Sequence, residues 1–321
     1  MVFSRGEYNG NRLANRVVGI FNREKRIKRS KRLHTESLKN KICEITREHF
    51  LYPSEFLSCS YAPQTLYCIG KAELLKTRKF TVVGSRRTPV AAAKLGEKIC
   101  EDLSEAFTLV TGVADGGDTV AIEGALQGSG KIICVLAGGF SQLPQGNFGL
   151  LERVAYTGLL LSPHPFDTPV RSFSYQQRNH LLSTLGEGVL VLSAGKKSGA
   201  LITAQYAFEQ NKPVFAIPYA PNTAAGEGCN DLIKKGGFLT ENSVDILGRF
   251  GIHLIEKKSK VALSDDETKL YVALKELGES HISELSVKSG VPAYKARAVL
   301  SALEVKGRIV AVGGNRYAPV L

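Results

Sequence analysis

The sequence lacks the features of a membrane or secreted protein. Its 321 residues include no tryptophan and a single methionine. No apolar run comes near the roughly 20 residues that a membrane-spanning helix needs. The N-terminus also lacks the apolar core of a signal peptide. We therefore expect a cytoplasmic protein without a membrane partner.

Cysteine is scarce and scattered. The six cysteines form no C-x-x-C pair, and most of them lie in apolar surroundings: Cys43, Cys59, Cys68, Cys100, Cys134 and Cys229. Paired spacing is what disulfide frameworks and structural zinc sites require. Reduced packing residues are therefore expected, and no metal.

Two fingerprints of phosphate-containing cofactors are absent as well. The turn after the apolar run 80–83 reads Gly84-Ser85-Arg86-Arg87 rather than G-x-G-x-x-G, and the run at 108–111 is not followed by an acidic residue for a ribose. No Walker A motif occurs. These absences argue against NAD, FAD and P-loop-bound ATP, so no cofactor is expected.

The net charge of +12 is unevenly distributed. Residues 1–41 hold 12 Lys and Arg against 3 Asp and Glu, and 23–32 form the densest basic run. Residues 42–255 carry 19 charges of each sign, and 256–321 carry 11 basic against 8 acidic residues. A basic chain is typical of a protein with a polyanionic partner, although solubility alone also explains such a charge. The N-terminal run thus indicates either a contact with a nucleic-acid backbone or a solvated tail.

Apolar runs alternate with helical patterns through the middle of the chain. Continuous apolar, β-branched runs indicate strands that are buried on both faces, and they occur at 80–83, 108–111, 131–136, 158–161, 188–192 and 213–217. The order predicts an α/β fold, a doubly wound and mostly parallel sheet. The preceding segment, 42–70, is expected to be an extended connector that packs on this sheet, because its prolines disfavour long helices.

In a doubly wound sheet, ligands bind beyond the carboxyl ends of the strands. The residues that follow the first three central strands are candidates: Gly84, Ser85, Arg86 and Arg87; Gly112, Ala114, Asp115, Gly116, Gly117 and Asp118; Ala137, Gly138 and Gly139. The first junction combines a helix start with two guanidinium groups, which is typical of an anion site. An ordinary turn with solvated arginines is the alternative.

A second junction repeats this arrangement. Lys196 and Lys197 precede Ser198 and Gly199, which begin another helical pattern containing Thr203. Small residues let a ligand approach the backbone, and the helix start supplies N–H donors. For Ser198 alone, a simple N-cap is the competing interpretation.

Several motifs occur in one order over residues 51–247. They are Tyr52-Pro53, Gly84-Ser85-Arg86, Gly112-x-Ala114-x-Gly116-x-Asp118-Thr119, Leu136-x-Gly138-Gly139, Phe173 with Arg178-Asn179, Ser198-Gly199-x-Leu201-Ile202-Thr203-Ala204 and Gly228-x-Asn230-x-Leu232-Ile233-x-x-Gly236. Together they resemble the DNA-processing protein A family (DprA/Smf). The resemblance implies an extended Rossmann domain that binds single-stranded DNA without a catalytic cofactor and helps to load a RecA-type recombinase during natural transformation.

The resemblance also implies site residues. Gly84, Ser85 and Arg86 would belong to the DNA-binding pocket together with Phe173, Arg178 and Asn179, while Ser198, Gly199 and Thr203 would shape the same cleft. We expect Arg86 and Arg178 to hold phosphates without contributing to stability.

The sequence departs from the family pattern at four positions. Asp115 stands where the family usually has arginine, Gly117 where it has isoleucine, Ile122 where it has histidine and Tyr219 where it has glycine. The charge reversal at position 115 would oppose a polyanion.

The C-terminal part has the pattern of a winged helix. Helical stretches at 266–277, 281–289 and 292–306 precede a predicted hairpin around Gly313-Gly314-Asn315. Residues 292–321 carry five basic side chains against one acidic, which suits either DNA contact or a dimerisation or regulatory module. The predicted organisation is a basic segment 1–41, an α/β domain 42–250, a linker 251–264 and a winged-helix domain 265–321. A homodimer is left open.

The resulting hypothesis is a non-enzymatic protein that binds single-stranded DNA. An enzyme or sensor of a small nucleotide is the first alternative, with Asp115, Asp118 and Glu123 as acid–base groups. A transcriptional regulator that reads duplex DNA with its winged helix is the second.

Overall fold

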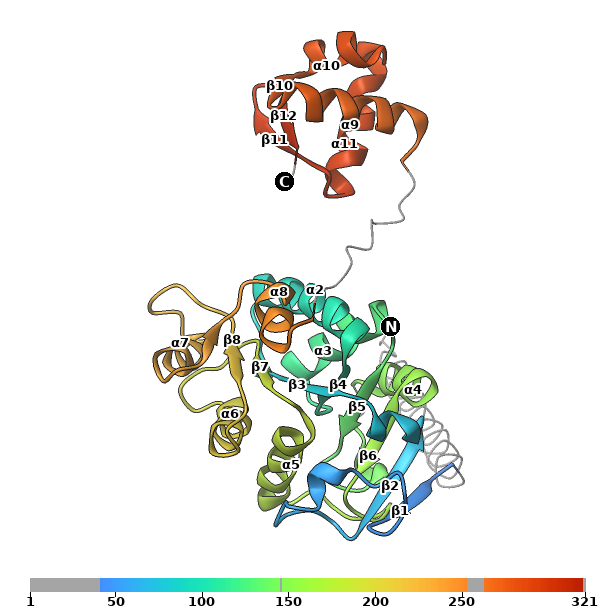
Figure 1. The fold of residues 1–321 in the computed structure, drawn as a ribbon, viewed down its shortest axis with the longest axis vertical. Coiled ribbons are helices and arrows are strands. Elements are labelled where there is room, and N and C mark those ends of the chain that lie inside the picture. Colours follow the sequence, from blue (N-terminus) through green and yellow to red (C-terminus); the bar gives the residue numbers. More distant parts are fainter. Residues whose placement is uncertain (1–40, 145, 253–262, 320–321) are drawn as a thin grey trace, which may run out of the picture. The chain divides into compact units, whose positions relative to one another are not determined.

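The computed structural model describes residues 41–144, 146–252 and 263–319 (Figure 1). These residues belong to two compact units, one on each side of 253–262. Apart from Lys41, the basic segment 1–41 lies outside the described residues, and so does most of the predicted linker 251–264. The predicted domain boundaries therefore stay predictions at these two places.

The larger unit is built on a nine-stranded sheet in the order β1-β2-β6-β5-β4-β3-β7-β8-β9. Its strands are β1 (Cys43–Thr46), β2 (Thr65–Gly70), β3 (Lys79–Val83), β4 (Thr108–Thr111), β5 (Ile132–Val135), β6 (Leu159–Ser162), β7 (Val189–Val191), β8 (Val214–Ala216) and β9 (Phe238–Leu239). The chain winds from β3 out to β6 and then returns to β7 on the other side of β3, with parallel pairing throughout. This confirms the predicted doubly wound sheet.

Helices cover both faces of the sheet (Figure 1). They are α2 (Val90–Ala106), α3 (Gly117–Gln127), α4 (Phe148–Thr157), α5 (Ser172–Leu185), α6 (Ala200–Glu209), α7 (Glu227–Lys234) and α8 (Ser243–Leu247), with short 3-10 turns η1 (Ser54–Phe56), η2 (Ala72–Lys76), η3 (Phe140–Gln142) and η4 (Gly248–Phe250). Residues of α2, α3, α4 and α8 pack in one hydrophobic core, and those of α5, α6 and α7 pack in the other. Successive β3 residues, Val82 and Val83, enter opposite cores, so the strand is apolar without alternation.

The prediction of an extended connector over residues 42–70 missed two strands of the sheet. This segment contains β1 and β2, which pair antiparallel with each other and add to the sheet beside β6. Pro53 and Pro63 lie between the two strands, where they interrupt no ladder. Leu66 and Cys68 are buried in one core and Ile69 in the other, so the signal of the missed strand was the short apolar run 66–69.

The smaller unit consists of three helices and a small sheet in the order β10-β12-β11. Its elements are α9 (Asp265–Leu277), β10 (Ser280–His281), α10 (Ile282–Ser289), α11 (Ala293–Val305), β11 (Ile309–Gly313) and β12 (Arg316–Pro319). Leu270, Leu274, Leu285 and Leu300 are buried in its separate core. The predicted winged helix is confirmed, with β10 as an additional strand. Within the described residues, no helix has the length and apolar character that a bilayer crossing demands.

Candidate functional site

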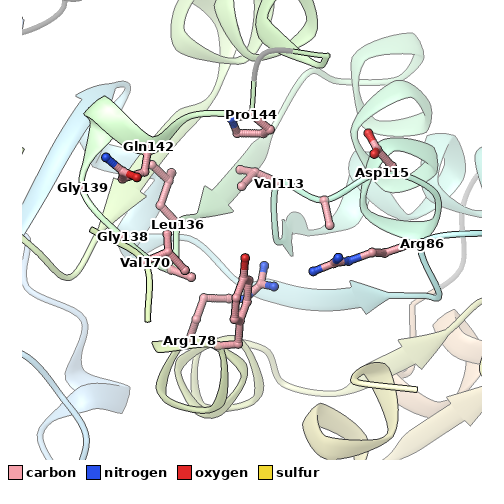
Figure 2. Close-up of a pocket in the computed structure, with 13 residues that line it drawn as sticks. Arg86, Val113, Asp115, Leu136, Gly138, Gly139, Gln142, Pro144, Val170 and Arg178 are labelled. Carbon is pink, nitrogen blue, oxygen red and sulfur yellow. The ribbon is translucent and has the colours of Figure 1, made fainter. Parts of the chain in front are cut away.

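A cavity of about 230 Å³ opens where β3, β4 and β5 end and α5 begins (Figure 2). Its lining residues come from four segments that are distant in sequence: Arg86; Val113, Ala114 and Asp115; Leu136, Ala137, Gly138, Gly139, Gln142 and Pro144; Val170, Tyr175 and Arg178. Three of the predicted strand ends therefore meet in one place. This is the position at which a doubly wound sheet binds its ligands.

Ser85 fixes the first loop to the neighbouring strand. Its hydroxyl lies 2.9 Å from the hydroxyl of Ser193, which follows β7, and its backbone N–H donates to the Ser193 carbonyl at 2.8 Å. Thr88 joins the same cluster, because its hydroxyl lies 2.9 Å from that of Ser193 and donates to the Ser85 carbonyl at 3.0 Å. The Ser85 side chain therefore holds the loop in place beneath Arg86.

Arg86 lies exposed at the rim of the cavity. Its guanidinium carbon is 5.9 Å from the centre of the Tyr175 ring, so the two side chains flank the same opening. Arg87 is also exposed but is not among the lining residues. The sequence made Arg86 and Arg87 equal candidates, but only Arg86 lines the cavity.

Arg178 lies in the wall of the cavity and is only 8% exposed. Its Nη1 atom is 3.6 Å from Oδ2 of Asp118, and this oxygen accepts a hydrogen bond from the Ala114 N–H at 3.1 Å. Burial raises the pKa of the Asp118 carboxyl, and the positive charge of Arg178 opposes this rise. An exposed Arg178 would make no contribution to stability, but the structure shows a buried partner of an ion pair, so we expect Arg178 to contribute to stability.

Gly112 makes this pair possible. A Cβ atom at Gly112 would lie 1.6 Å from Nη1 of Arg178 and 2.2 Å from Oδ2 of Asp118, so no other residue fits without displacing them. Gly117 has a similar packing role, because a Cβ atom there would lie 2.3 Å from Cα of Gly84. Glycine at position 117, where the family usually has isoleucine, thus allows α3 to lie close to the loop that begins at Gly84.

Two guanidinium nitrogens of Arg178, Nε and Nη1, are buried without a hydrogen-bond partner among the described residues. Buried donors are rarely left in this state, because an unmade hydrogen bond costs about 1–3 kcal/mol. Since Arg178 lines the cavity, its guanidinium group places a positive charge in the wall, which attracts an anion.

Asp115 is exposed on the wall of the cavity (Figure 2). In the figure it lies on the same side as Arg86. A carboxylate in this position weakens the attraction that Arg86 exerts on a phosphate. The other two departures are packing residues: Ile122 is fully buried, and the Tyr219 hydroxyl donates to the Leu192 carbonyl at 2.7 Å.

The second predicted junction lines a different surface. Lys196, Lys197 and Ser198 border an open groove together with Tyr206, apart from the cavity of Arg86. Asn179 faces this side, since its Nδ2 atom donates to the Gly199 carbonyl at 3.2 Å. The structure therefore does not place the residues after β7 in one cavity with those after β3, β4 and β5.

Three further predicted residues lie outside the cavity lining. Phe173 is half exposed in the first turn of α5, Thr203 is buried in α6, and Gly116 precedes α3 with a positive φ of 75°. The sequence prediction missed Tyr175, which lines the cavity. Its position three residues before Arg178 in a helical pattern was a usable signal, because such residues share one face of a helix.

The described residues contain no group of three or more His, Cys, Asp or Glu side chains placed to hold a metal ion. Two guanidinium groups, one exposed and one buried, and an aromatic ring surround the cavity. Such a set can bind a phosphate and stack on a planar group.

Two family models match the chain, and curated proteins and solved structures resemble it. A family model described as DNA recombination-mediator protein A matches residues 44–251, and one described as sugar-specific transcriptional regulator TrmB matches 258–320. Protein Smf of Escherichia coli is 32% identical over 276 residues, which cover 82% of this chain and 74% of that protein. DNA processing protein DprA of Streptococcus pneumoniae is 36% identical over 201 residues, 62% of this chain and 71% of that protein.

Solved structures show the same fold. The crystal structure of DprA from S. pneumoniae has a TM-score of 0.63 at 33% identity, with 69% of this chain and 78% of that chain covered. The DprA structure from Helicobacter pylori, described for its single-stranded DNA binding mode, has a TM-score of 0.60 at 28% identity and covers 67% of this chain and 100% of that chain. Because the first family model spans well over half of the sequence, the chain belongs to the DNA recombination-mediator protein A family, that of DprA and Smf.

Proposed function

We propose that this protein binds single-stranded DNA, with phosphates held at the cavity between Arg86 and Arg178. The observation that carries the proposal is the pair of guanidinium groups at that cavity, Arg86 exposed at its rim and Arg178 in its wall. A phosphate oxygen meets both requirements of such a site, negative charge and hydrogen-bond acceptors. Tyr175 beside Arg86 offers a ring on which a base stacks. The related H. pylori protein, described for its single-stranded DNA binding, supports the choice of ligand.

We propose that the separate groove of Lys196 and Lys197 contacts further phosphates of the same strand. A strand that occupies the cavity continues over more than one nucleotide, and further phosphates need further cations. Asn179 ties α5 to the loop that carries these lysines, so both parts are positioned by one helix. We therefore retain the predicted set from both junctions as the proposed DNA-binding residues.

The enzyme alternative is weakened by the state of its acidic groups. Asp118 is held by Arg178 and the Ala114 N–H, and Glu123 pairs with Arg153 at 3.3 Å. Asp115 is exposed and has no neighbouring base among the cavity residues. A general acid or base must reach the reacting atom, and neither paired carboxylate is free to do so. The proposal is therefore a binding protein without catalysis.

The regulator alternative depends on the winged helix. Residues 263–319 carry 8 basic and 7 acidic side chains, so this unit is close to neutral. Three of its predicted DNA-contacting cations are paired within the unit: Lys295 with Asp266, Lys306 with Glu267 and Arg316 with Glu279. Duplex binding relies on free cations, so this pairing favours the α/β unit as the main DNA-binding part.

Membership of this family also supports a role in DNA uptake and recombination. Within that setting we propose that the protein protects the strand and helps to load a RecA-type recombinase onto it. A test of this step is strand exchange by a purified recombinase on DNA that is first coated with this protein. Slower exchange than on naked DNA at every protein concentration would contradict the loading role.

The binding proposal is tested by titrating fluorescent oligonucleotides over a salt series. Single strands should bind more tightly than duplexes of the same sequence, and affinity should rise from a mononucleotide to a 20-mer. It should also fall steeply with salt, because each bound phosphate releases counterions. Tightest binding of a mononucleotide would favour the nucleotide sensor, and preference for duplex would favour the regulator.

A further inference from the structure

Cys59 lies in a cluster of polar groups that the proposed DNA site does not use. Its sulfur is 3.3 Å from Nδ1 of His180 and 3.7 Å from the hydroxyl of Thr184. These residues come from the loop after η1 and from the second half of α5. Lys212, just before β8, donates from Nζ to the Thr184 carbonyl at 2.6 Å. A thiol, an imidazole and a hydroxyl thus lie together, and the Lys212 ammonium group binds the backbone carbonyl of the same threonine.

The hydrogen bonds define which group donates to which. The single hydroxyl hydrogen of Thr184 is directed to the His180 carbonyl, 2.9 Å away, and the hydroxyl oxygen accepts from Nε2 of Gln210 at 3.2 Å. Thr184 is therefore not a donor to the ring. Nδ1 of His180 lies 3.3 Å from both the Thr184 hydroxyl and the Cys59 sulfur. In the tautomer with the ring proton on Nε2, Nδ1 accepts the hydrogen bond of the Cys59 thiol.

Two tyrosine rings hold the imidazole in this orientation. The centre of the His180 ring is 4.8 Å from that of Tyr61 and 4.6 Å from that of Tyr206. Partial burial also lowers the pKa of His180, which keeps the ring neutral and able to accept a proton. A nucleophile, a base within hydrogen-bonding distance and groups that orient the base are the arrangement of an activated thiol.

We propose that Cys59 is a modification site, a reactive thiol that is oxidised by peroxides with His180 as its base. Cys59 is partly exposed, in contrast to the buried cysteines. Among the described cysteines, Cys43 is more exposed, whereas Cys68, Cys100, Cys134 and Cys229 are buried. No hydrogen bond of a histidine to Cys43 occurs among the described residues; its thiol contacts the Glu44 carbonyl at 3.9 Å.

The reaction consumes one peroxide. The thiol proton passes to Nδ1 of His180 as the sulfur attacks one peroxide oxygen, and the O–O bond breaks. The departing hydroxide takes the proton from the imidazole and becomes water. Sulfur is oxidised by two electrons to a sulfenic acid, and hydrogen peroxide is reduced to that sulfenic oxygen and one water.

The position of Cys59 gives the modification a structural consequence. His180 follows Asn179 and Arg178 on α5, and its ring contacts Tyr206, which borders the groove of Lys196 and Lys197. An added oxygen on the sulfur lies against this ring. Oxidation of Cys59 therefore changes the surroundings of α5, the helix that carries Arg178.

The experiment treats the full chain with limiting hydrogen peroxide, stops the reaction at intervals, unfolds the protein and alkylates the remaining thiols for peptide mass spectrometry. Cys59 should lose its free thiol at least about ten times faster than Cys43, a small part of the two to four orders of magnitude that a positioned base supplies. Equal loss at the two sites, or faster loss at the more exposed Cys43, would overturn the proposal. This comparison needs no variant, because Cys43 serves as the internal reference.

The His180→Gln variant tests the base. Glutamine keeps a polar side chain of similar length but cannot take up the proton, so the oxidation rate of Cys59 should fall to that of Cys43. The rate of Cys43 should stay unchanged, and the four buried cysteines should stay protected in both proteins, which reports that the variant is folded. An unchanged rate at Cys59 in a folded variant would show that exposure alone sets its reactivity and would refute the role of His180.

Discussion

Arg86 is the exposed cation of the cavity, and its loss should affect binding without affecting stability. Its side chain lies at the rim, over the Tyr175 ring, and it is not buried in either core. We expect Arg86→Ala to weaken single-strand binding by about 1.5–3 kcal/mol, the usual contribution of a hydrogen bond to a charged group. Fluorescence anisotropy at fixed salt measures this loss, and the melting temperature should hardly change.

Arg87→Ala is the matched control for this variant. It removes the same charge from the adjacent exposed position, which does not line the cavity. The structure predicts a smaller loss, of the size expected from long-range attraction alone. Equal losses for the two variants would mean that the cavity has no special role for Arg86.

Arg178 should affect both stability and binding. Removing one partner of a buried ion pair leaves an uncompensated charge, here on Asp118, and typically costs about 3–5 kcal/mol. We expect Arg178→Ala to lower the melting temperature by several degrees and to weaken single-strand binding in the same protein.

A double variant separates these two effects. Arg178→Met combined with Asp118→Asn removes both charges while keeping comparable volumes, so much of the stability should return. Binding should stay weak, because the guanidinium group in the cavity wall is gone. Full recovery of binding with stability would assign Arg178 to a purely structural role.

Asp115 opposes the ligand that the arginines attract. It is exposed in the cavity wall, where its interaction with a phosphate is screened by water and salt. We expect Asp115→Asn to tighten single-strand binding slightly and Asp115→Arg to tighten it further, by roughly 1 kcal/mol at low salt. The gain should shrink as salt is added, and a salt-independent gain would indicate a changed structure instead.

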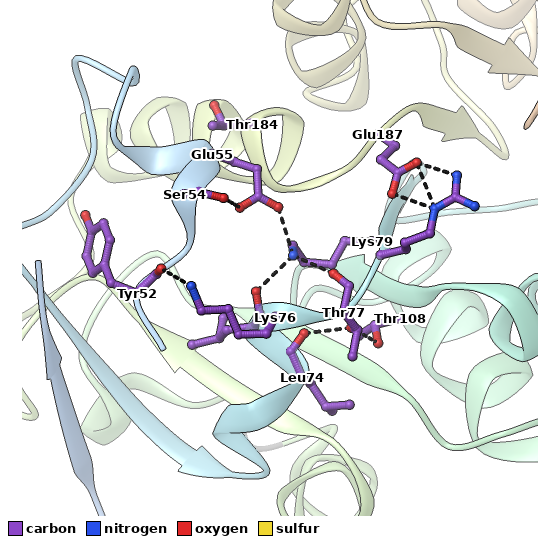
Figure 3. A network of polar contacts seen from close by, with 12 residues as sticks. Tyr52, Ser54, Glu55, Leu74, Lys76, Thr77, Lys79, Thr108, Thr184 and Glu187 are labelled. Carbon is purple, nitrogen blue, oxygen red and sulfur yellow. Dashed lines mark hydrogen bonds and ion pairs between the residues drawn. The ribbon is translucent and has the colours of Figure 1, made fainter. Parts of the chain in front are cut away.

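At the scale of elements, different interactions hold the two ends of β3 in place. At its amino end Lys79 is 3% exposed, pairs with Glu55 of η1 at 2.8 Å and donates to the carbonyls of Leu75 and Thr77 (Figure 3). At its carboxyl end the hydroxyl cluster of Ser85 and Ser193 holds the loop of Arg86. The ion pair of Lys79 with Glu55 connects the segment of β1 and β2 to the central strand.

The two partners of the Lys79 pair differ in burial, which predicts unequal costs of removal. Glu55 is 35% exposed, so Lys79→Met leaves a carboxylate that water can reach and two unpaired carbonyls, for a loss of about 1–3 kcal/mol. Glu55→Ala leaves a buried ammonium group without its acid and should cost about 3–5 kcal/mol. Urea unfolding measures both losses, and a larger loss in Lys79→Met would contradict this assignment.

Single-strand binding should be unchanged in both variants. Lys79 begins β3, whereas Arg86 follows its other end, so the substituted residues lie at the edge of the sheet away from the cavity. A binding loss in either variant would mean that η1 positions the DNA site through α5.

The sequence predicted the central strands because each is a continuous apolar run between turn residues. The prediction was less complete for β1 and β2. Strand β1 pairs only with β2, and the pairing of β2 with β6 joins residues about ninety positions apart, such as Tyr67 with Ser162. The same limit applies to the site. Gly84 and Arg86 were visible as a strand end with a cation, but the burial of Arg178 depends on space left by Gly112 and on Asp118 of another helix.

At the scale of the whole molecule, the two units have separate hydrophobic cores. The stability of the smaller one depends on acidic residues of α9. Lys306 contacts Glu267 at 2.6 Å and Lys295 contacts Asp266, and these partners lower the pKa of both carboxyls. The N-terminal turn of α9 adds to this, because the Ser264 N–H donates to Glu267 at 2.7 Å.

A carboxyl whose pKa is lowered in the folded state contributes stability above its unfolded pKa and loses it as pH falls through the folded value. For Glu267 the ordinary value is 4.5, so its contribution should be complete at pH 7 and should decline from about pH 4.5 downward. Glu267→Gln removes this titration. The variant should therefore be less stable than the parent at pH 7, and the difference between the two should shrink as pH falls below about 4.5.

Hydrogen exchange of the full chain measures this difference in α9 and α11, which belong to the smaller unit. Strands β3 and β4 of the larger unit serve as the reference, because each unit has its own core and Glu267 makes its contacts within the smaller one. A difference that stays constant from pH 7 to pH 3 would show that Glu267 acts through packing rather than through its charge. Equal effects on β3 and α9 would show that the two units unfold together.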